Sequence, residues 1–389
     1  MKITDLSLCS GCGACAAKCP KGAINFKEDE YGRGIPDIDD EKCIRCEICV
    51  KTCPINHGFF KSKSAPEKCY ALQAADREKI MGCSSGGVAT VIGRYIIQKG
   101  GYVFGCRFDP AFDLNYVECG TLEELETIKG SKYVQSSLTE CYPLIKKRLE
   151  QGKDVLVTGL PCQIAGLRGY LQRQYDNLYL LDLICHGTPP VKYLKEHLKK
   201  FEDKGARRIR FRDERGFVFS LSDNSGNEIY SIKSKCDEYY AAFLEGLIYR
   251  ENCYKCAYAD TKRVSDITIG DFWGLDKKAL HNRFEGAVSV GIINTEKGAE
   301  LFDEVKDLFI WEERTLAEAL RENEQLRKPM QPDESDRKTF LKYYPALGFD
   351  GAVRKTDLYK KRVAGAQWKN SFLKTPVGQI LKRIKGKIK

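Results

Sequence analysis

Apolar and polar residues alternate in short blocks between positions 70 and 201, and the blocks switch between two periods. Short runs rich in Val, Ile, Leu and aromatic residues predict strands at 70–75, 102–108, 155–159 and 178–184. Segments with helical spacing of apolar residues predict helices at 86–98, 139–151, 162–172 and 192–201. Further strand-like runs follow at 207–212, 218–222 and 266–272. The fold class predicted from this alternation is α/β with α+β, built on a mixed sheet.

The first 62 residues follow a different pattern, which is set by cysteines. Two runs share the spacing C-x2-C-x2-C-x3-C-P, and they consist of Cys9, Cys12, Cys15, Cys19 and Pro20, and of Cys43, Cys46, Cys49, Cys53 and Pro54. In such a run three thiolates hold one 4Fe-4S cluster, and the cysteine before proline reaches the other cluster. The two predicted ligand sets are therefore Cys9, Cys12, Cys15 and Cys53, and Cys43, Cys46, Cys49 and Cys19. Paired zinc sites are the alternative, but zinc loops join C-x2-C elements at longer separations. The sequence thus predicts a two-cluster ferredoxin domain.

The amino-acid composition indicates the cellular compartment in which the protein is expected. Of the 389 residues, 42% are hydrophobic and 18 are cysteines. No apolar run approaches the ~20 residues that span a bilayer, and the first residues lack the apolar stretch of a signal peptide. We therefore expect a cytoplasmic protein, in which thiols stay reduced and soft metals, rather than disulfides, account for the cysteines.

The formal net charge of +10 is concentrated near the C-terminus. Residues 354–389 contain twelve Lys or Arg and a single Asp, so the preceding chain is nearly neutral and no nucleic-acid partner is expected. After Pro376, apolar residues recur at helical spacing while basic residues fill the other face. This pattern predicts a basic amphipathic helix, which is either solvated or in peripheral contact with a membrane.

Four further cysteines lie in contexts that favour a shared site. Cys162 follows a strand-to-helix turn, and Cys185 ends the next apolar strand. In α/β sheets such strand ends hold ligands. Cys253 and Cys256 form a C-x2-C pair, so the four thiolates could hold a third cluster. Burial of Cys162 and Cys185 as small apolar residues is the alternative.

Five stretches, in this order along the chain, resemble a known family. They are 83–87 (CSSGG), 129–136 (KGSKYVQS), 159–167 (GLPCQIAGL), 184–187 (ICHG) and 265–274 (SDITIGDFWG). The family that they resemble is the coenzyme F-420 hydrogenase/dehydrogenase beta-subunit family, which includes formate dehydrogenase beta subunits. The resemblance implies FAD as a bound flavin, and it favours the third cluster.

Candidate residues for the flavin lie within these stretches. The cofactor-binding candidates are Ser84, Ser85, Gly86, Gly87, Lys129, Lys132 and Tyr133. The first four precede a predicted helix, where free N–H groups suit a phosphate, although an ordinary helix cap is the alternative. His186 and Asp271 are the catalytic candidates, since they could line the active site and His186 could donate a proton.

The predicted organisation has four parts. They are a ferredoxin domain at 1–62, the two parts of a flavin-binding body at 67–150 and 151–340, and a basic tail at 341–389. The function expected is an iron–sulfur flavoprotein oxidoreductase that passes electrons between 4Fe-4S clusters and FAD, with ferredoxin or a reduced deazaflavin coenzyme as donor. The expected partner is ferredoxin or another redox protein. The alternative is an electron-transfer subunit of a hydrogenase or dehydrogenase. The sequence does not name a small-molecule substrate.

Overall fold

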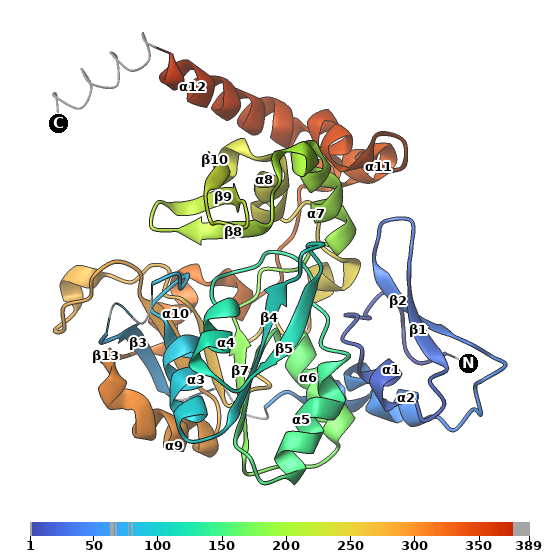
Figure 1. Ribbon diagram of the computed structural model, residues 1–389, viewed down its shortest axis with the longest axis vertical. Coiled ribbons are helices and arrows are strands. Elements are labelled where there is room, and N and C mark those ends of the chain that lie inside the picture. Colours follow the sequence, from blue (N-terminus) through green and yellow to red (C-terminus); the bar gives the residue numbers. More distant parts are fainter. Residues whose placement is uncertain (1, 63–65, 67, 77, 79–80, 376–389) are drawn as a thin grey trace.

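A computed structural model describes residues 2–62, 66, 68–76, 78 and 81–375 (Figure 1). Its largest feature is an eight-stranded sheet. The strands lie in the order β13 (Phe309–Arg314), β3 (Lys68–Ala74), β12 (Ser289–Ile293), β11 (Ile267–Asp271), β7 (Leu178–Leu183), β6 (Val155–Gly159), β4 (Tyr102–Phe108) and β5 (Leu114–Cys119). The four central strands β11, β7, β6 and β4 are parallel, and the outer pairs are antiparallel. The sheet therefore takes strands from both parts of the predicted body.

Helices cover both faces of this sheet because alternate strand residues are apolar on each side. One face packs against α3 (Val88–Gln98), α4 (Leu122–Thr127) and α9 (Glu296–Val305). The other face packs against α5 (Cys141–Glu150), α6 (Pro161–Leu171) and α10 (Leu316–Glu322). Neighbouring residues of β6 show the division, since Val155 and Val157 join the α5–α6 side while Leu156 joins the α3–α9 side.

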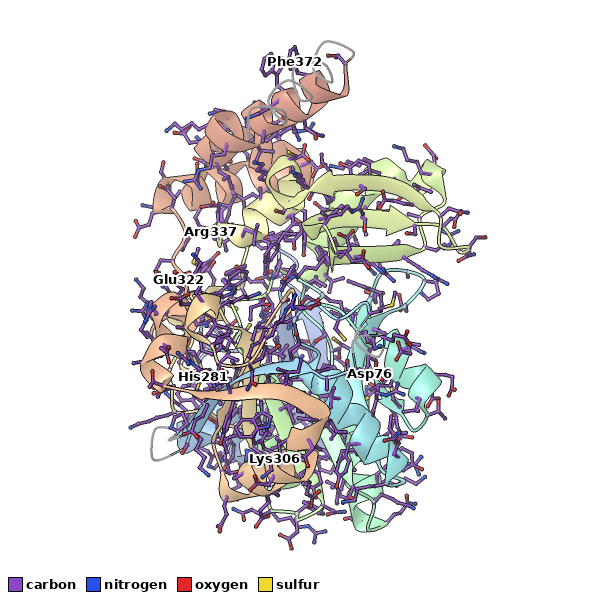
Figure 2. The ribbon with its side chains drawn as sticks, turned by 90° about the vertical axis from the view of Figure 1, so that its left-hand side faces the viewer. Asp76, His281, Lys306, Glu322, Arg337 and Phe372 are labelled. Atoms are coloured by element: carbon purple, nitrogen blue, oxygen red, sulfur yellow. The ribbon has the colours of Figure 1, made fainter. Side chains whose placement is uncertain are left out.

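A second layer of structure lies above the large sheet (Figures 1 and 2). It contains the antiparallel sheet β10 (Glu228–Lys233), β9 (Gly216–Ser222) and β8 (Arg208–Asp213). Around it lie α7 (Val191–Leu198), α8 (Glu238–Leu244), α11 (Glu334–Lys355), a π-helical turn (Tyr359–Val363) and α12 (Ala364–Lys374). An aromatic core that includes Tyr193, Phe219, Tyr239 and Phe349 joins these elements.

The N-terminal segment forms a small cysteine-rich module beside α6 (Figure 1). It consists of α1 (Ala14–Lys18), the hairpin of β1 (Ile24–Glu28) and β2 (Gly34–Ile38), α2 (Ile48–Thr52) and a 3-10 segment (Pro54–Phe60). Two glycines of α6 permit the close approach. A Cβ atom at Gly166 would lie 2.9 Å from the Cys12 sulfur, and one at Gly169 would lie 2.2 Å from the Thr52 carbonyl oxygen. The module is thus packed firmly against the body.

The strands predicted at 102–108 and 155–159 are confirmed with the same bounds, and the other predicted elements of the body are confirmed to within a few residues. Residue 341, where the tail was expected to begin, lies inside α11, whose Tyr344, Phe349 and Val353 are buried. The amphipathic helix predicted after Pro376 lies outside the described residues. No helix among the residues that the structure describes is long and apolar enough to cross a membrane.

Candidate functional site

The eight repeat cysteines gather in the two interleaved sets that the spacing predicts. Burial, with the nearby charges of Cys9 and Cys53, raises the pKa of Cys12 to about 12. Cys53 thus lies with the first run although it belongs to the second in sequence. The set formed by Cys19, Cys43, Cys46 and Cys49 surrounds a small cavity of its own, and Cys46 is exposed. We call the first set proximal, because Cys12 contacts α6, and the second set distal.

Cys162, Cys185, Cys253 and Cys256 also come together, although up to 94 positions separate them. Burial, and then the nearby charges of Cys185, Cys256 and Cys253, raise the pKa of the Cys162 thiol far above its usual value. Cys162 lies at the start of α6 and Cys185 follows β7, whereas Cys253 lies within a 3-10 turn (Glu251–Lys255) and Cys256 directly follows it. The charge of Cys12 also acts on Cys162, so this third set lies beside the proximal set.

The spacing of the sulfur atoms bears on the choice between zinc and clusters. Tetrahedral zinc, with Zn–S bonds of about 2.3 Å, would hold its thiolates roughly 3.8 Å apart. Among the residues described, the one group of three or more His, Cys, Asp or Glu whose ligand atoms lie within 4.8 Å of one another contains no cysteine. Thiolates around a four-iron core must lie farther apart than around a single ion. The cysteine sets therefore fit clusters better than zinc.

A cavity of about 580 Å³ opens at the carboxyl ends of the parallel strands β6, β7 and β11. This is the position at which α/β sheets bind ligands, and the volume falls in the range of cofactor sites. Arg212 and Phe217 of the small sheet and Phe243 of α8 line its other side. Cys185 also lines it, so the third cysteine set reaches the wall of the cavity.

The residues predicted for the flavin meet at this cavity, with one exception. Those that line it are Ser84, Ser85, Gly87, Lys129, Lys132, Tyr133, His186 and Asp271. Gly86 lies behind the wall, where its N–H donates to the Ser289 hydroxyl and a Cβ atom would lie 2.2 Å from the Leu72 carbonyl oxygen. A side chain at position 86 would therefore separate the 83–87 loop from the sheet.

The amino terminus of α3 provides hydrogen-bond donors at one end of the cavity. Gly87 precedes the helix with a φ of 81°, and no side chain caps the first turn. The first N–H groups of a helix lack intrahelical partners and carry partial positive charge. Gly87, Val88 and Ala89 all line the cavity. This end is suited to a phosphate group.

The side chains of the two predicted lysines, Lys129 and Lys132, bond to neighbouring groups of the protein, although both residues line the cavity. The Lys132 ammonium donates to the carbonyls of Ile128, Lys129 and Gly130 at 2.6–3.0 Å, and burial lowers its pKa. Lys129 forms an ion pair with Glu126 at 2.6 Å. Tyr133 stacks on Phe243 at 4.5 Å between ring centroids. Among these candidates the aromatic ring is the group best placed to contact a planar ligand.

An arginine that sequence reasoning did not select forms the charged part of the cavity. Arg212 donates to both carboxylate oxygens of Asp271, at 2.6 and 3.3 Å. Asp271 is therefore paired, and the pair as a unit presents donors and acceptors to a ligand. Burial lowers the pKa of His186, despite the opposing charge of Asp271, so His186 is a neutral imidazole near pH 7.

The position of Arg212 and the role of Gln163 could not be recognised from motifs. The strand-like run at 207–212 was visible, but 59 positions separate Arg212 from Asp271. Gln163 lines the cavity as well, and its amide bonds Ser136, Tyr116 and the Leu160 N–H. Because its partners are all within the protein, Gln163 shapes the wall rather than the chemistry.

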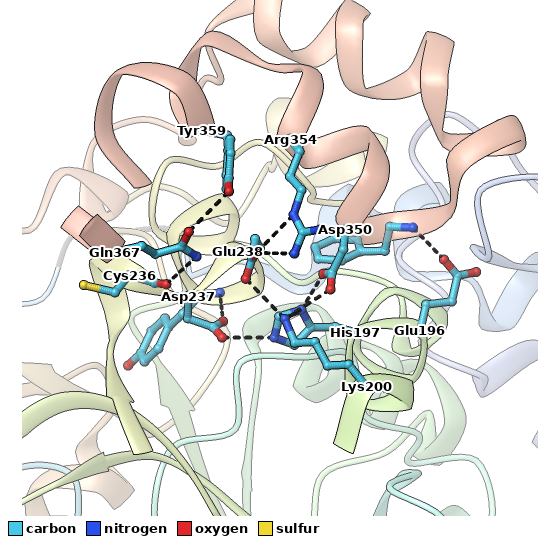
Figure 3. Close-up of polar contacts among 12 residues, drawn as sticks. Glu196, His197, Lys200, Cys236, Asp237, Glu238, Asp350, Arg354, Tyr359 and Gln367 are labelled. Atoms are coloured by element: carbon cyan, nitrogen blue, oxygen red, sulfur yellow. Dashed lines mark hydrogen bonds and ion pairs between the residues drawn. The ribbon is translucent and has the colours of Figure 1, made fainter. Parts of the chain in front are cut away.

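A second cluster of titratable groups lies among α7, α8 and α11 (Figure 3), and its residues are not among those that line the cavity. The two ring nitrogens of His197 bond Asp350 at 2.6 Å and Asp237 at 3.0 Å. Lys200 and Arg354 bind the third carboxylate, Glu238. Burial alone would lower the pKa of His197, but Asp237 and Asp350 outweigh it and raise the pKa to about 9. Although His197, Asp237 and Glu238 lie close enough to hold a metal ion, their ligand atoms are already bonded.

Comparisons with known proteins agree with this division into a cysteine-rich module and a larger body. Residues 8–57 match the model of the 4Fe-4S dicluster domain. Residues 152–318 match the family model that describes the C terminus of the coenzyme F420 hydrogenase/dehydrogenase beta subunit. The chain is an iron–sulfur protein with a dicluster domain joined to an α/β body. Residues 152–318 of that body carry a domain of the coenzyme F420 hydrogenase/dehydrogenase beta-subunit family.

Two relatives and a solved structure differ in how much of their length matches this chain. A subunit of the F(420)H(2) dehydrogenase of Methanosarcina mazei is 24% identical over 79% of this chain and 84% of its own length. Coenzyme F420-dependent sulfite reductase of Methanocaldococcus jannaschii is 31% identical over 48% of this chain but only 29% of its own length. A chain of the F420-reducing NiFe hydrogenase complex from Methanosarcina barkeri covers 72% of this chain and 94% of itself, with a TM-score of 0.45 and 17% identity.

Proposed function

We propose that this protein is an iron–sulfur flavoprotein oxidoreductase of the cytoplasm that moves electrons between 4Fe-4S clusters and FAD. The observation that carries the proposal is the contact between Cys185 of the third set and the large cavity. The distal, proximal and third sets, and then the cavity, follow one another through the molecule. Clusters in these sets would supply one-electron transfer, and FAD would exchange single electrons for a hydride.

The cavity residues divide into three tasks in this proposal. The first turn of α3, with Ser84 and Ser85, would hold the pyrophosphate. Tyr133 and the Phe217–Trp273 stack, whose rings lie 5.9 Å apart, would contact the planar ring system. His186 would donate or accept a hydrogen bond at the reacting edge, and the Arg212–Asp271 pair would orient the ligand.

Purification without oxygen tests the proposal. We expect about twelve iron atoms per chain, since each 4Fe-4S cluster holds four, and one FAD. About eight irons would leave clusters only in the repeat, and iron without flavin would contradict the flavoprotein assignment. Arg212→Gln is expected to weaken FAD binding about tenfold, because a charged hydrogen-bond donor is worth roughly 1.5–3 kcal/mol. Arg215→Gln, at an exposed ion pair of the same sheet, is the control.

Turnover assays identify the electron donor and distinguish an enzyme from a component that needs a partner. Ferredoxin or a reduced deazaflavin is the proposed donor, and the distal set, with exposed Cys46, is the proposed docking region for a redox protein. The second candidate function, a component without a substrate of its own, is favoured by the names of the relatives, which are parts of larger dehydrogenases. Turnover by the isolated chain would support the enzyme, whereas turnover only after addition of a partner would support the second function.

We also propose that the C-terminal helices contact an anionic membrane surface. Trp368 on α12 is 70% exposed and stacks on Phe372, which lies at the outer end of the molecule (Figure 2). Exposed aromatic rings beside Lys and Arg suit a lipid interface. Co-sedimentation with phosphatidylglycerol vesicles should be lost when the chain ends after Val363. Equal binding to neutral phosphatidylcholine vesicles, or none at all, would contradict this contact.

A further inference from the structure

We propose that Arg250 is a fixed positive charge between the proximal and third cysteine sets, and that it raises the reduction potentials of the groups bound there. This inference rests on the proposed function, since it concerns the clusters that these two sets would hold. Arg250 is a positioning residue and is not a ligand. Arg250 lies outside the sequence motifs described above.

Arg250 lies where the N-terminal module meets the body, and its side chain is 2% exposed. Its Nη2 atom donates to the carbonyl oxygens of Cys9 at 3.2 Å and Gly34 at 3.0 Å. Its Nη1 atom donates to the Gln135 side-chain oxygen at 2.8 Å. On the main chain, the N–H of Cys253 donates to the Arg250 carbonyl. One residue thus bonds the proximal set through Cys9 and the third set through Cys253.

The neighbours of Arg250 leave its charge unbalanced. Within the described part of the chain, no carboxylate forms an ion pair with it, and its acceptors are carbonyl and amide oxygens. Arg263 gives the contrast, because it is 3% exposed and lies near the third set but is paired with Asp182 at 2.9 Å. A buried and unpaired guanidinium costs several kcal/mol. Arg250 therefore requires negative charge from another source.

The two cysteine sets are that source. The guanidinium of Arg250 donates to the Cys9 carbonyl, and the main chain of Arg250 accepts from the Cys253 N–H, so both sets lie beside its charge. Four thiolates outweigh the positive charge of a 4Fe-4S core, so each loaded set is an anion. Reduction adds one electron and no proton, which increases the negative charge. A positive charge nearby stabilises the reduced form and raises its potential, as charge and hydrogen bonding are known to do at such clusters.

Packing around Arg250 fixes the position of its charge. A Cβ atom at Gly11 would lie 2.8 Å from the Gln135 side chain and 3.2 Å from Nη2 of Arg250. The loop of the proximal set therefore closes directly over the guanidinium group. Because the fork of donors is planar and held by four acceptors, the group cannot swing away from either set.

Potentiometric titration followed by electron paramagnetic resonance, on the full chain without oxygen, tests the inference. In Arg250→Gln, the one-electron reduction constants of two clusters should fall at least tenfold, or about 59 mV each. The distal cluster should keep its potential and serves as an internal reference. Arg250→Lys, which restores the charge, should recover most of the shift. Arg337→Gln is the matched control, because Arg337 is also buried and bonds backbone carbonyls but is paired with Glu251.

A second variant keeps the inference testable if Arg250→Gln does not fold. Gln135→Glu has the same shape and places a carboxylate against Nη1 of Arg250, so it neutralises the charge without removing the residue. The same two potentials should fall. Unchanged potentials in both variants, or a uniform shift of all three clusters, would overturn the role of Arg250. A wild-type chain with fewer than three clusters would instead contradict the proposed function, so the two failures are distinguishable.

Discussion

Two buried regions of this protein concentrate charged groups, and they differ in how the charge is balanced. Around His197, three cations (His197, Lys200 and Arg354) meet three carboxylates (Asp237, Glu238 and Asp350). Around Arg250, a single guanidinium lies between eight cysteines of two sets, with no carboxylate paired to it among the described residues. The first region is complete as it stands, whereas the second requires negative charge, which the thiolates of the two cysteine sets would supply when clusters are bound.

This difference indicates that the His197 region stabilises the fold, whereas the Arg250 region is suited to a bound group. A balanced network such as that of His197 ties α7, α8 and α11 together, and nothing in it requires a ligand (Figure 3). An unbalanced buried charge costs several kcal/mol of stability unless a bound group compensates it. The imbalance at Arg250 therefore argues for loaded clusters independently of the cysteine spacing.

Among the predicted substitutions, loss of a cysteine from the third set should have the largest effect. In Cys185→Ser, the iron content is expected to fall by about one third, since the third of the three proposed clusters would lose a thiolate. Reduction of bound flavin from the N-terminal module should stop, because Cys185 also lines the cavity. Iron analysis and flavin bleaching measure both effects. Cys236→Ser, a buried cysteine outside the sets, should change neither.

Replacement of the central residue of the balanced network should act on stability alone. His197→Gln leaves Asp237 and Asp350 without their shared cation, and loss of one partner of a buried ion pair costs about 3–5 kcal/mol. Denaturant unfolding measures the change. Iron content and cluster potentials should stay the same in the folded fraction. His281→Gln, at an exposed histidine, is the control, and an equal loss of stability there would contradict the prediction.

The balanced network should also make stability depend on pH. The pKa of His197 is raised to about 9 in the folded protein, above its ordinary value near 6.5, so protonation favours the folded state. The contribution is complete below pH 6.5 and is lost as the pH rises through 9, which amounts to roughly 2 kcal/mol between pH 7 and pH 9. Unfolding midpoints measured across this interval should fall in the wild type and stay flatter in His197→Gln.

The two regions also differ in how well the sequence predicts them. The cysteine repeat is local, so its spacing alone predicts both ligand sets. The His197 network joins residues 40 and 153 positions apart, and no periodicity marks such pairs. The predicted tail begins at residue 341, which lies inside α11, a helix that contains Pro345 and Gly348 (φ 64°) and has buried residues on both sides of them. The motifs contain His186 and Asp271, which line the cavity, whereas Arg212 belongs to a separate sheet and no motif marks it.

The smallest expected effect lies at the edge of the balanced network. Arg354 bonds Glu238 at 2.8 Å, but its side chain is 51% exposed. Solvent screens an exposed pair, and Glu238 keeps Lys200 at 3.2 Å as a second cation. Arg354→Gln should therefore cost less than about 1 kcal/mol, and the cost should shrink further in high salt. A loss comparable to that of His197→Gln would mean that charge balance matters across the whole network and not only at its buried centre.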